Sequence, residues 1–443
     1  MINSEHLATA STEHMLIATS VLVVSYIIIF SEKLHRASAA LLGAVTMIVV
    51  GMWFGFYDQA KALHAIDANT MLLLMGMMLI VAMIRPTGGF EYLAIKIAKK
   101  TAKSPKRLLV YLCLAVSIIS MFLDNVTTVI IFAPLTVLIT RLLFLNPMPF
   151  LMAEAMLSNI GGIGTLVGDP PNIMIGSAAH IDFTRFMIHM VPIVVVVWCC
   201  VVGLVLFLFR DNLQPNTNTS TKIDLDEHKA IKDPAGLKKI LFVLGVVIGL
   251  FFIHHHLHLY PSFVSFIGIA LAIILIQPNI EKILLEVEWP VLLFFASLFI
   301  IVGGVEASGV LSLIGNQLAE FANDPKKLLI TAIILMWVAA IVSAIVDNIP
   351  FTVTMIPIVL GLETQGINVT PLWWALALGV GMGGNGTHIG ATANIICMAE
   401  AERCGMPEAC ISPKIWMKKG LPVMFVSLIV CSIVFAIFFD FFL

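Results

Sequence analysis

The sequence predicts an all-α membrane protein that crosses the bilayer many times and consists of two inverted repeats. Three observations predict this fold: an apolar composition, a series of long apolar segments, and polar motifs that occur twice in the same order. Of the 443 residues, 60% are hydrophobic and 12% are charged, and the mean hydropathy is +1.02. Globular domains are about 45–50% apolar and about 25% charged. The net charge of −2 provides no basic domain for nucleic acid.

Eight segments have the composition of continuous spans, for which about 20 apolar residues are needed. They lie at about 15–31, 38–56, 68–85, 187–209, 238–257, 261–277, 288–306 and 420–442. Four further apolar segments are interrupted by Gly, Pro, Asn and Asp, at 107–145, 151–180, 328–361 and 371–403. The first fourteen residues lack the basic region of a signal peptide, so the first span is expected to stay in the chain. We expect a multi-pass protein of the cell (inner) membrane.

The polar motifs of the interrupted segments recur at a nearly constant distance. Asp124-Asn125 recurs as Asp347-Asn348, 223 positions later, and GGIGTLVGDPPN at 161–172 recurs as GGNGTHIGATAN at 383–394. Further matches at similar distances are Pro134 with Pro357, Gly88 with Gly309, and PKRLL at 105 with PKKLL at 325. Such self-similarity indicates internal repeats.

The expected domain bounds follow from these matches. They are 1–37 for an N-terminal segment and first span, 38–210 for repeat 1, 211–239 for a polar linker, 240–259 for a connecting span, and 260–443 for repeat 2. The basic residues of the linker favour the cytoplasm. The stretch 96–107 holds six Lys or Arg residues, whereas the equivalent 316–327 holds two. This asymmetry favours opposite sides of the membrane, and therefore inverted repeats.

The glycine-rich motif predicts a broken helix in each repeat. Four Gly in eight residues followed by Asp-Pro-Pro do not continue a helix, so we expect a helix from about 151 to unwind near Gly161–Gly168 and restart at Pro170 or Pro171. Unwound carbonyls bind cations, and helix N-termini bind anions or polar groups. The Asp-Asn pair has two interpretations that hydropathy leaves open: a surface turn between two full crossings, or the tip of a re-entrant hairpin.

The motifs FLDNVTT, SNIGGIGTLVGDPPN, DNIPFTVTMIPI and GGNGTHIGATAN resemble the ion transporter superfamily. Within it they are similar to the branch of the ArsB arsenite permeases, the NhaD sodium/proton antiporters and the P proteins. The resemblance covers about 70–443. It implies re-entrant hairpins, a scaffold domain with a transport domain that moves as an elevator, and a homodimer. It also implies that the hairpin tips face the broken helices and enclose substrate and cation sites.

Polar residues of the tips and the broken helices form the predicted site. The predicted substrate- and ion-binding residues are Asp124, Asn125, Thr127, Thr128, Asn159, Gly164, Thr165, Gly168, Asp169, Asn172, Asp347, Asn348, Asn385, Gly386, Thr387, Gly390, Thr392 and Asn394. The candidates for proton coupling are Asp124, Asp169, Asp347 and His388. We expect no cofactor and no metal site, and H⁺ or Na⁺ as the coupling ion. The run HHHLH at 254–258 is expected to be an interfacial helix end rather than a metal cluster.

The three aspartates restrict the substrate. They would repel a dianion unless they were protonated or paired with a cation, and none of the four motifs contains Arg or Lys. A proton, a cation or a neutral oxyacid is therefore favoured. The alternative role of each Asp is to cap the helix that follows it.

The substrate that we predict first is arsenite or antimonite, exported in exchange for protons. Sodium/proton antiport and transport or channelling of a chloride-like anion are the alternatives. The small inorganic substrate and the lipid bilayer are then the expected partners, besides the second copy of a homodimer. An enzyme is disfavoured because neither H-E-x-x-H nor G-x-S-x-G is present.

Overall fold

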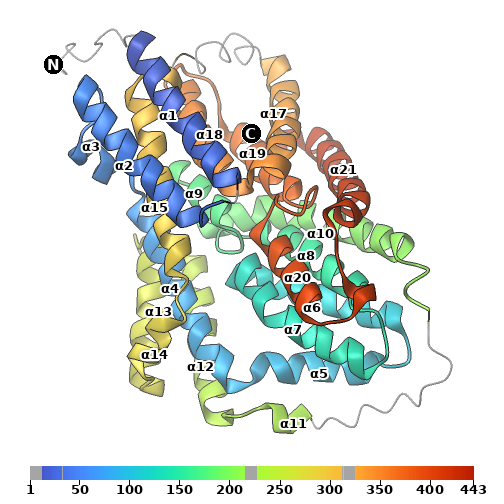
Figure 1. Cartoon of the computed structure of the whole chain (residues 1–443). Coiled ribbons are helices and arrows are strands. Elements are labelled where there is room, and N and C mark those ends of the chain that lie inside the picture. The colour runs from blue at the N-terminus through green and yellow to red at the C-terminus, as the bar shows by residue number, and fades with distance from the viewer. Residues whose placement is uncertain (1–11, 32, 215–226, 312, 314–324) are drawn as a thin grey trace.

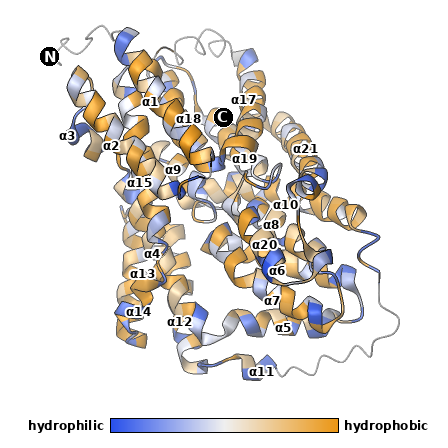
Figure 2. Ribbon diagram, in the orientation of Figure 1, coloured by the Kyte–Doolittle hydropathy of each residue, from blue (hydrophilic) through white to orange (hydrophobic). Residues whose placement is uncertain are grey.

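The computed structural model describes residues 12–31, 33–214, 227–311, 313 and 325–443. Within these ranges every regular element is an α-helix or a 3-10 helix (Figure 1). Ten of the described helices are long and apolar enough to cross a membrane. Large apolar side chains such as Ile27, Ile274, Ile345 and Ile437 are exposed, and apolar residues cover most helices (Figure 2). A lipid bilayer accepts such a surface, so the chain is an integral multi-pass membrane protein.

Each of the eight continuous segments forms one helix, as predicted. These helices are α1 (Thr12–Phe30), α2 (Arg36–Phe54), α4 (Ala68–Ile84), α10 (Phe183–Leu208), α12 (Pro234–Ile253), α13 (Pro261–Ile276), α15 (Trp289–Ala307) and α21 (Pro413–Ile437). Short helices connect them: α3 (Gln59–Ala65), α5 (Gly89–Thr101), α11 (Glu227–Ala230) and α14 (Ile280–Leu285). Parts of the predicted linker and of the stretch 316–327 lie outside the described residues.

Each interrupted segment forms two helices. They are α6 (Pro105–Leu123) with α7 (Asn125–Leu142), α8 (Met148–Gly162) with α9 (Pro170–Ala178), α17 (Pro325–Val346) with α18 (Asn348–Glu363), and α19 (Thr370–Gly383) with α20 (Thr392–Arg403). A single residue, Asp124 or Asp347, separates the two helices of each hairpin. These two residues have φ values of 70° and 76°, a region that non-glycine residues rarely adopt.

The helices pack in reciprocal pairs. α2 packs on α15 and α4 on α13, while α9 packs on α18 and α20 on α7. Exchange of the two halves reproduces this pattern, which is the arrangement of inverted repeats. The hairpin α6–α7 lies in the lower half of the molecule and α17–α18 in the upper half (Figure 1).

The first helix of the chain has a counterpart between the halves. α1 packs on α2 as α12 packs on α13, and Leu34-His35 after α1 recurs as Leu257-His258 after α12, again 223 positions later. The expected domain bounds leave both α1 and α12 outside the repeats. The packing instead places the α1–α2 corner and the α12–α13 corner in equivalent positions.

Candidate functional site: two hairpin tips and two broken helices

The first hairpin tip is held by its own aspartate. Asp124 Oδ1 accepts a hydrogen bond from the Thr127 backbone N–H at 2.8 Å, and its Oδ2 accepts one from Thr127 Oγ1 at 2.7 Å. Thr128 Oγ1 donates to the backbone carbonyl of Asp124 at 2.6 Å. Asp124 is therefore the N-cap of α7, which is the alternative role considered from the sequence.

The second tip lacks this cap because Pro350 occupies the position equivalent to Thr127. Proline has neither a backbone N–H nor a hydroxyl to donate, and the Asp347 side chain makes no capping bond to α18. Instead, Arg36 Nη1 donates to Asp347 Oδ2 at 2.9 Å. Asp347 Oδ1 is buried without a hydrogen-bond partner among the described residues. The two equivalent aspartates therefore have different roles.

The first broken helix unwinds where the sequence predicts. α8 ends at Gly162 and α9 begins at Pro170. Across this gap, Asn172 Nδ2 donates to the carbonyl oxygens of Gly162 at 3.1 Å and Thr165 at 2.9 Å. The Thr165 hydroxyl donates to the carbonyl of Met121, which joins the unwound segment to the first hairpin.

The second broken helix repeats these bonds. Asn394 Nδ2 donates to the carbonyl oxygens of Gly384 at 2.7 Å and Thr387 at 2.9 Å, and the Thr387 hydroxyl donates to the carbonyl of Ala344. In both repeats, therefore, a Thr and an Asn of the motif hold the unwound backbone in place. Their donors are used within the protein, so these four residues shape the site.

Glycine allows each broken helix to approach its hairpin. A Cβ at Gly161 would collide with the backbone of Ser117 on α6, and a Cβ at Gly383 would collide with the backbone of Ala340 on α17. Gly161 is the last but one residue of α8, and Gly383 is the last residue of α19. The repeated G-G of the motif is thus explained by close packing between backbones.

A cluster of four buried asparagines joins the two repeats. Asn125 Nδ2 donates to Asn159 Oδ1 at 3.1 Å. Asn159 Nδ2 in turn donates to the side-chain oxygens of Asn385 at 3.0 Å and Asn394 at 3.1 Å. Asn125 Oδ1 and Asn385 Nδ2 are buried without a partner among the described residues. This acceptor and this donor are two polar atoms that a ligand or a water molecule could satisfy.

Asp169 connects the first broken helix to the second tip. Asn348 Nδ2 lies 3.3 Å from each of its carboxylate oxygens, and Asp169 interacts electrostatically with Asp124 and Asp347. All three carboxylates are buried, at 9% exposure or less. Arg36 is the one Lys or Arg that an ion pair joins to them among the described residues. The sequence analysis missed it because Arg36 lies outside the four motifs, at the start of an apolar span.

The remaining predicted residues lie in or beside the unwound segments. Gly164, Gly168, Gly386 and Gly390 belong to these segments, and Thr392 is the first residue of α20. His388 is half-buried, and its Nδ1 has no partner within the described part of the chain. Glu154, one turn before Ser158 on α8, accepts a hydrogen bond from Thr136 Oγ1 on α7 at 2.5 Å.

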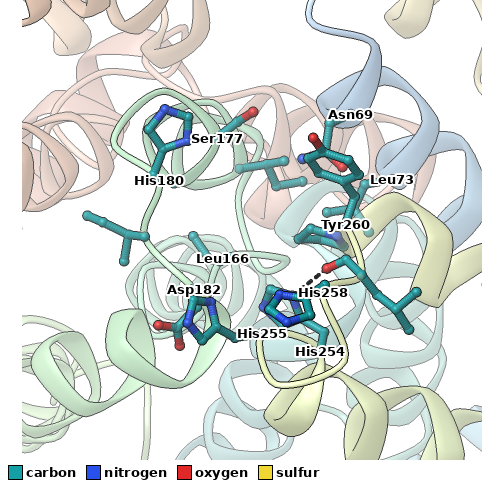
Figure 3. A pocket seen from close by; sticks show the side chains of 15 residues that line it. Asn69, Leu73, Leu166, Ser177, His180, Asp182, His254, His255, His258 and Tyr260 are labelled. Atoms are coloured by element: carbon teal, nitrogen blue, oxygen red, sulfur yellow. Dashed lines mark hydrogen bonds between the residues drawn. The ribbon is translucent and has the colours of Figure 1, made fainter.

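The HHHLH run borders a pocket of about 400 Å³ beside the first broken helix (Figure 3). His180, Asp182 and Leu166 line it together with His254, His255 and His258. The run does end α12, but His254 is buried and structural: its Nε2 accepts the Phe183 N–H at 3.3 Å, and its Nδ1 lies 2.9 Å from the Leu259 carbonyl. Among the described residues, no three His, Cys, Asp or Glu are placed to hold a metal ion.

Two broken helices that face two hairpin tips inside a multi-pass helical protein define a membrane transporter. A family model described as "CitMHS: Citrate transporter" matches residues 26–379, and the chain belongs to that family. It is 39% identical over 424 residues to the 46 kDa membrane protein of Mycobacterium leprae, with 94% of this chain and 97% of that protein covered. An uncharacterized transporter of Mycobacterium tuberculosis is 39% identical over 426 residues, with the same coverage.

The chain is also similar to the P protein of Homo sapiens. The two are 32% identical over 493 residues, which cover 93% of this chain and 58% of the P protein. The structure of the Alcanivorax borkumensis YdaH transporter covers 97% of this chain and 98% of its own, at 13% identity and a TM-score of 0.56. That likeness shows the fold alone. The predicted membership of the ion transporter superfamily, in the branch that includes the P proteins, is confirmed.

Proposed function

We propose that the protein is a secondary active transporter in which Asp169 and Asp347 bind the coupling ion, H⁺ or Na⁺. One observation carries the proposal: Asp169 interacts electrostatically with two other buried carboxylates, and the three have one arginine as an ion-pair partner among the described residues. Unbalanced negative charge inside a membrane protein is costly, so a proton or a metal cation is expected to bind there. Asp124 is the weakest candidate because its oxygens cap α7.

Sodium/proton antiport is the activity that this set of groups supports best. Carboxylate oxygens and the unpartnered Asn125 Oδ1 are hard ligands of the kind that Na⁺ accepts. Arsenite or antimonite efflux is the second candidate, supported by the asparagine cluster, whose free donor and acceptor suit a neutral hydroxide. This proposal therefore places sodium/proton antiport first, whereas the expectation from the sequence placed arsenite first.

Anionic substrates fit the site less well. The family description names citrate, and a citrate trianion would meet the three carboxylates unless cations accompanied it. A chloride-like anion meets the same repulsion. The elevator motion and the homodimer remain predictions from the resemblance.

The test is flux in proteoliposomes that contain the purified protein. An imposed Na⁺ gradient should acidify or alkalinise the lumen according to its direction, and an imposed pH gradient should drive ²²Na⁺ uptake. Arsenite, chloride and citrate are tested in turn under the same pH gradient. Arsenite uptake without Na⁺-driven proton movement would establish the second candidate, and citrate or chloride uptake alone would contradict both.

A further inference from the structure

The α1–α2 corner holds the tip of the second hairpin. Arg36, the first residue of α2, donates to Asp347 at 2.9 Å. On α1, the Tyr26 hydroxyl donates to the Pro350 carbonyl at 3.0 Å and lies 3.1 Å from Thr354 Oγ1. Three polar contacts from one corner thus reach the Asp347 turn and the first two turns of α18.

The surroundings of the ion pair exclude most water. The side chain of Asp347 is 7% exposed and that of Arg36 is 29% exposed. The space beside them is a cavity of about 20 Å³, lined by apolar residues that include Phe30, Phe294 and Ile389. Removal of one member of a desolvated pair leaves the other as an uncompensated charge, so this contact has a large effect on the position of the tip.

The equivalent corner makes no such ion pair among the described residues. The repeat makes the α12–α13 corner the equivalent of the α1–α2 corner, and the first hairpin tip the equivalent of the second. A contact corresponding to the one described above would therefore join the first tip to the α12–α13 corner. Its His254 instead bonds the Phe183 N–H at the start of α10, and Asp124 has no ion-pair partner among the described residues. The position equivalent to Arg36 is Leu259, which carries no charge. The ion pair at the second tip is therefore a feature of that half alone.

Pro350 makes the contact possible. An aspartate that caps its own helix, as Asp124 does, has both oxygens engaged. Because Pro350 donates nothing, Asp347 keeps one oxygen for Arg36 and a second without a partner in the described structure.

We propose that Arg36 is a positioning residue for transport: it fastens the second hairpin to the α1–α2 corner and must release Asp347 when the transporter changes its access state. The proposal deepens the proposed function, since it takes Asp347 as a group that exchanges Arg36 for the coupling ion. Binding of that ion and the bond to Arg36 then weaken each other, because both draw on the single negative charge of Asp347, and opening of the tip becomes dependent on the ion.

The test measures the exposure of the second tip independently of flux. Ile349, buried at the tip, is replaced by Cys after the exposed Cys199, Cys200 and Cys410 have been changed to Ser. The rate of labelling by a membrane-impermeant maleimide is then compared in proteoliposomes. Arg36→Gln should raise the rate about tenfold, and Arg36→Lys should restore most of the protection. Arg85→Gln, which breaks the exposed pair with Glu286, is the matched control and should leave the rate unchanged.

A second variant does not remove the arginine. Pro350→Thr gives Asp347 a backbone N–H and a hydroxyl to accept, as Thr127 does for Asp124, and should raise the labelling rate with Arg36 intact. Equal labelling in Arg36→Gln, Pro350→Thr and the parent protein would overturn the proposal. If the labelling rates change as expected while no Na⁺ or H⁺ moves, the contact stands and the proposed function falls.

Discussion

Asn348 at the second hairpin tip and Asp169 in the first broken helix form a contact between the two repeats: the amide nitrogen lies 3.3 Å from each carboxylate oxygen. Asn348 belongs to the second repeat and Asp169 to the first, so the contact depends on how the two repeats pack. A neutral donor orients the carboxylate without cancelling its charge, so Asp169 keeps its capacity to bind a cation or a proton. A change of conformation that separates the tip from the broken helix would also change the environment of this charge.

Replacement of Asp169 by Asn should therefore uncouple transport. The amide retains the shape of the side chain but binds neither a proton nor Na⁺ strongly, so ion-driven flux should fall by about a hundredfold, which corresponds to ~2.7 kcal/mol. Flux in proteoliposomes under a fixed pH gradient measures this. Asp211→Asn, at a largely exposed position, is the control and should transport normally. Coupled flux at the normal rate in Asp169→Asn would show that the carboxylate is structural.

The two tip aspartates should respond differently to the same substitution. Asn caps helices about as well as Asp, so Asp124→Asn should retain the bond to Thr127 and most of the flux, whereas Asp347→Asn should lose coupled flux. Asp124→Ala should lower stability by about 0.5–2 kcal/mol, measured as the shift of thermal unfolding in detergent. The reverse order of the two Asn variants would assign the coupling role to the first tip.

The sequence predicted the breaks in the helices because local chemistry determines them. Pro170-Pro171 and the glycines before them stop a helix in any environment, and the repetition of the motif identified the second break. The roles of the individual residues in the motifs were harder to predict from the sequence. Asn172 and Asn394 donate hydrogen bonds to the carbonyls of their own broken helices. The sequence alone does not distinguish this structural role from ligand binding.

Contacts between distant segments could not be predicted from motifs. Arg36 pairs with a residue 311 positions later, and its own surroundings in the sequence show only a basic residue before an apolar span. The difference between Asp124 and Asp347, in contrast, was readable: Pro350 at the equivalent of Thr127 removes the donor that a capping aspartate needs. From the sequence, both aspartates were nevertheless assigned the same candidate roles, ligand and helix cap.

Asn159 should be the least replaceable member of the asparagine cluster. It bonds Asn125 in the first tip and both Asn385 and Asn394 in the second broken helix. Asn159→Ala leaves these partners buried without it, at a cost of about 1–3 kcal/mol for each unsatisfied group, and should lower both the unfolding temperature and flux. Asn146→Ala, which removes a hydrogen bond to the Glu408 carbonyl and one from the Met148 N–H near the surface, should lower both far less. An unchanged unfolding temperature in Asn159→Ala would mean that water reaches the cluster and replaces the hydrogen bonds of the amide.

The close packing of hairpins on broken helices predicts a matched pair of glycine variants. Gly161→Ala and Gly383→Ala each place a methyl group against backbone, of Ser117 and Ala340, where no flexible side chain can move aside. Each should destabilise the protein by about 1–3 kcal/mol. Each should also slow transport, because the broken helix no longer packs closely against the hairpin. Gly203 and Gly245 are the controls, since a Cβ at either meets no protein atom within 4 Å. Alanine there should be neutral or stabilise its helix by about 0.5–1 kcal/mol. If Gly161→Ala is destabilising and Gly383→Ala is not, close packing of the broken helix on its hairpin is required in the first repeat only.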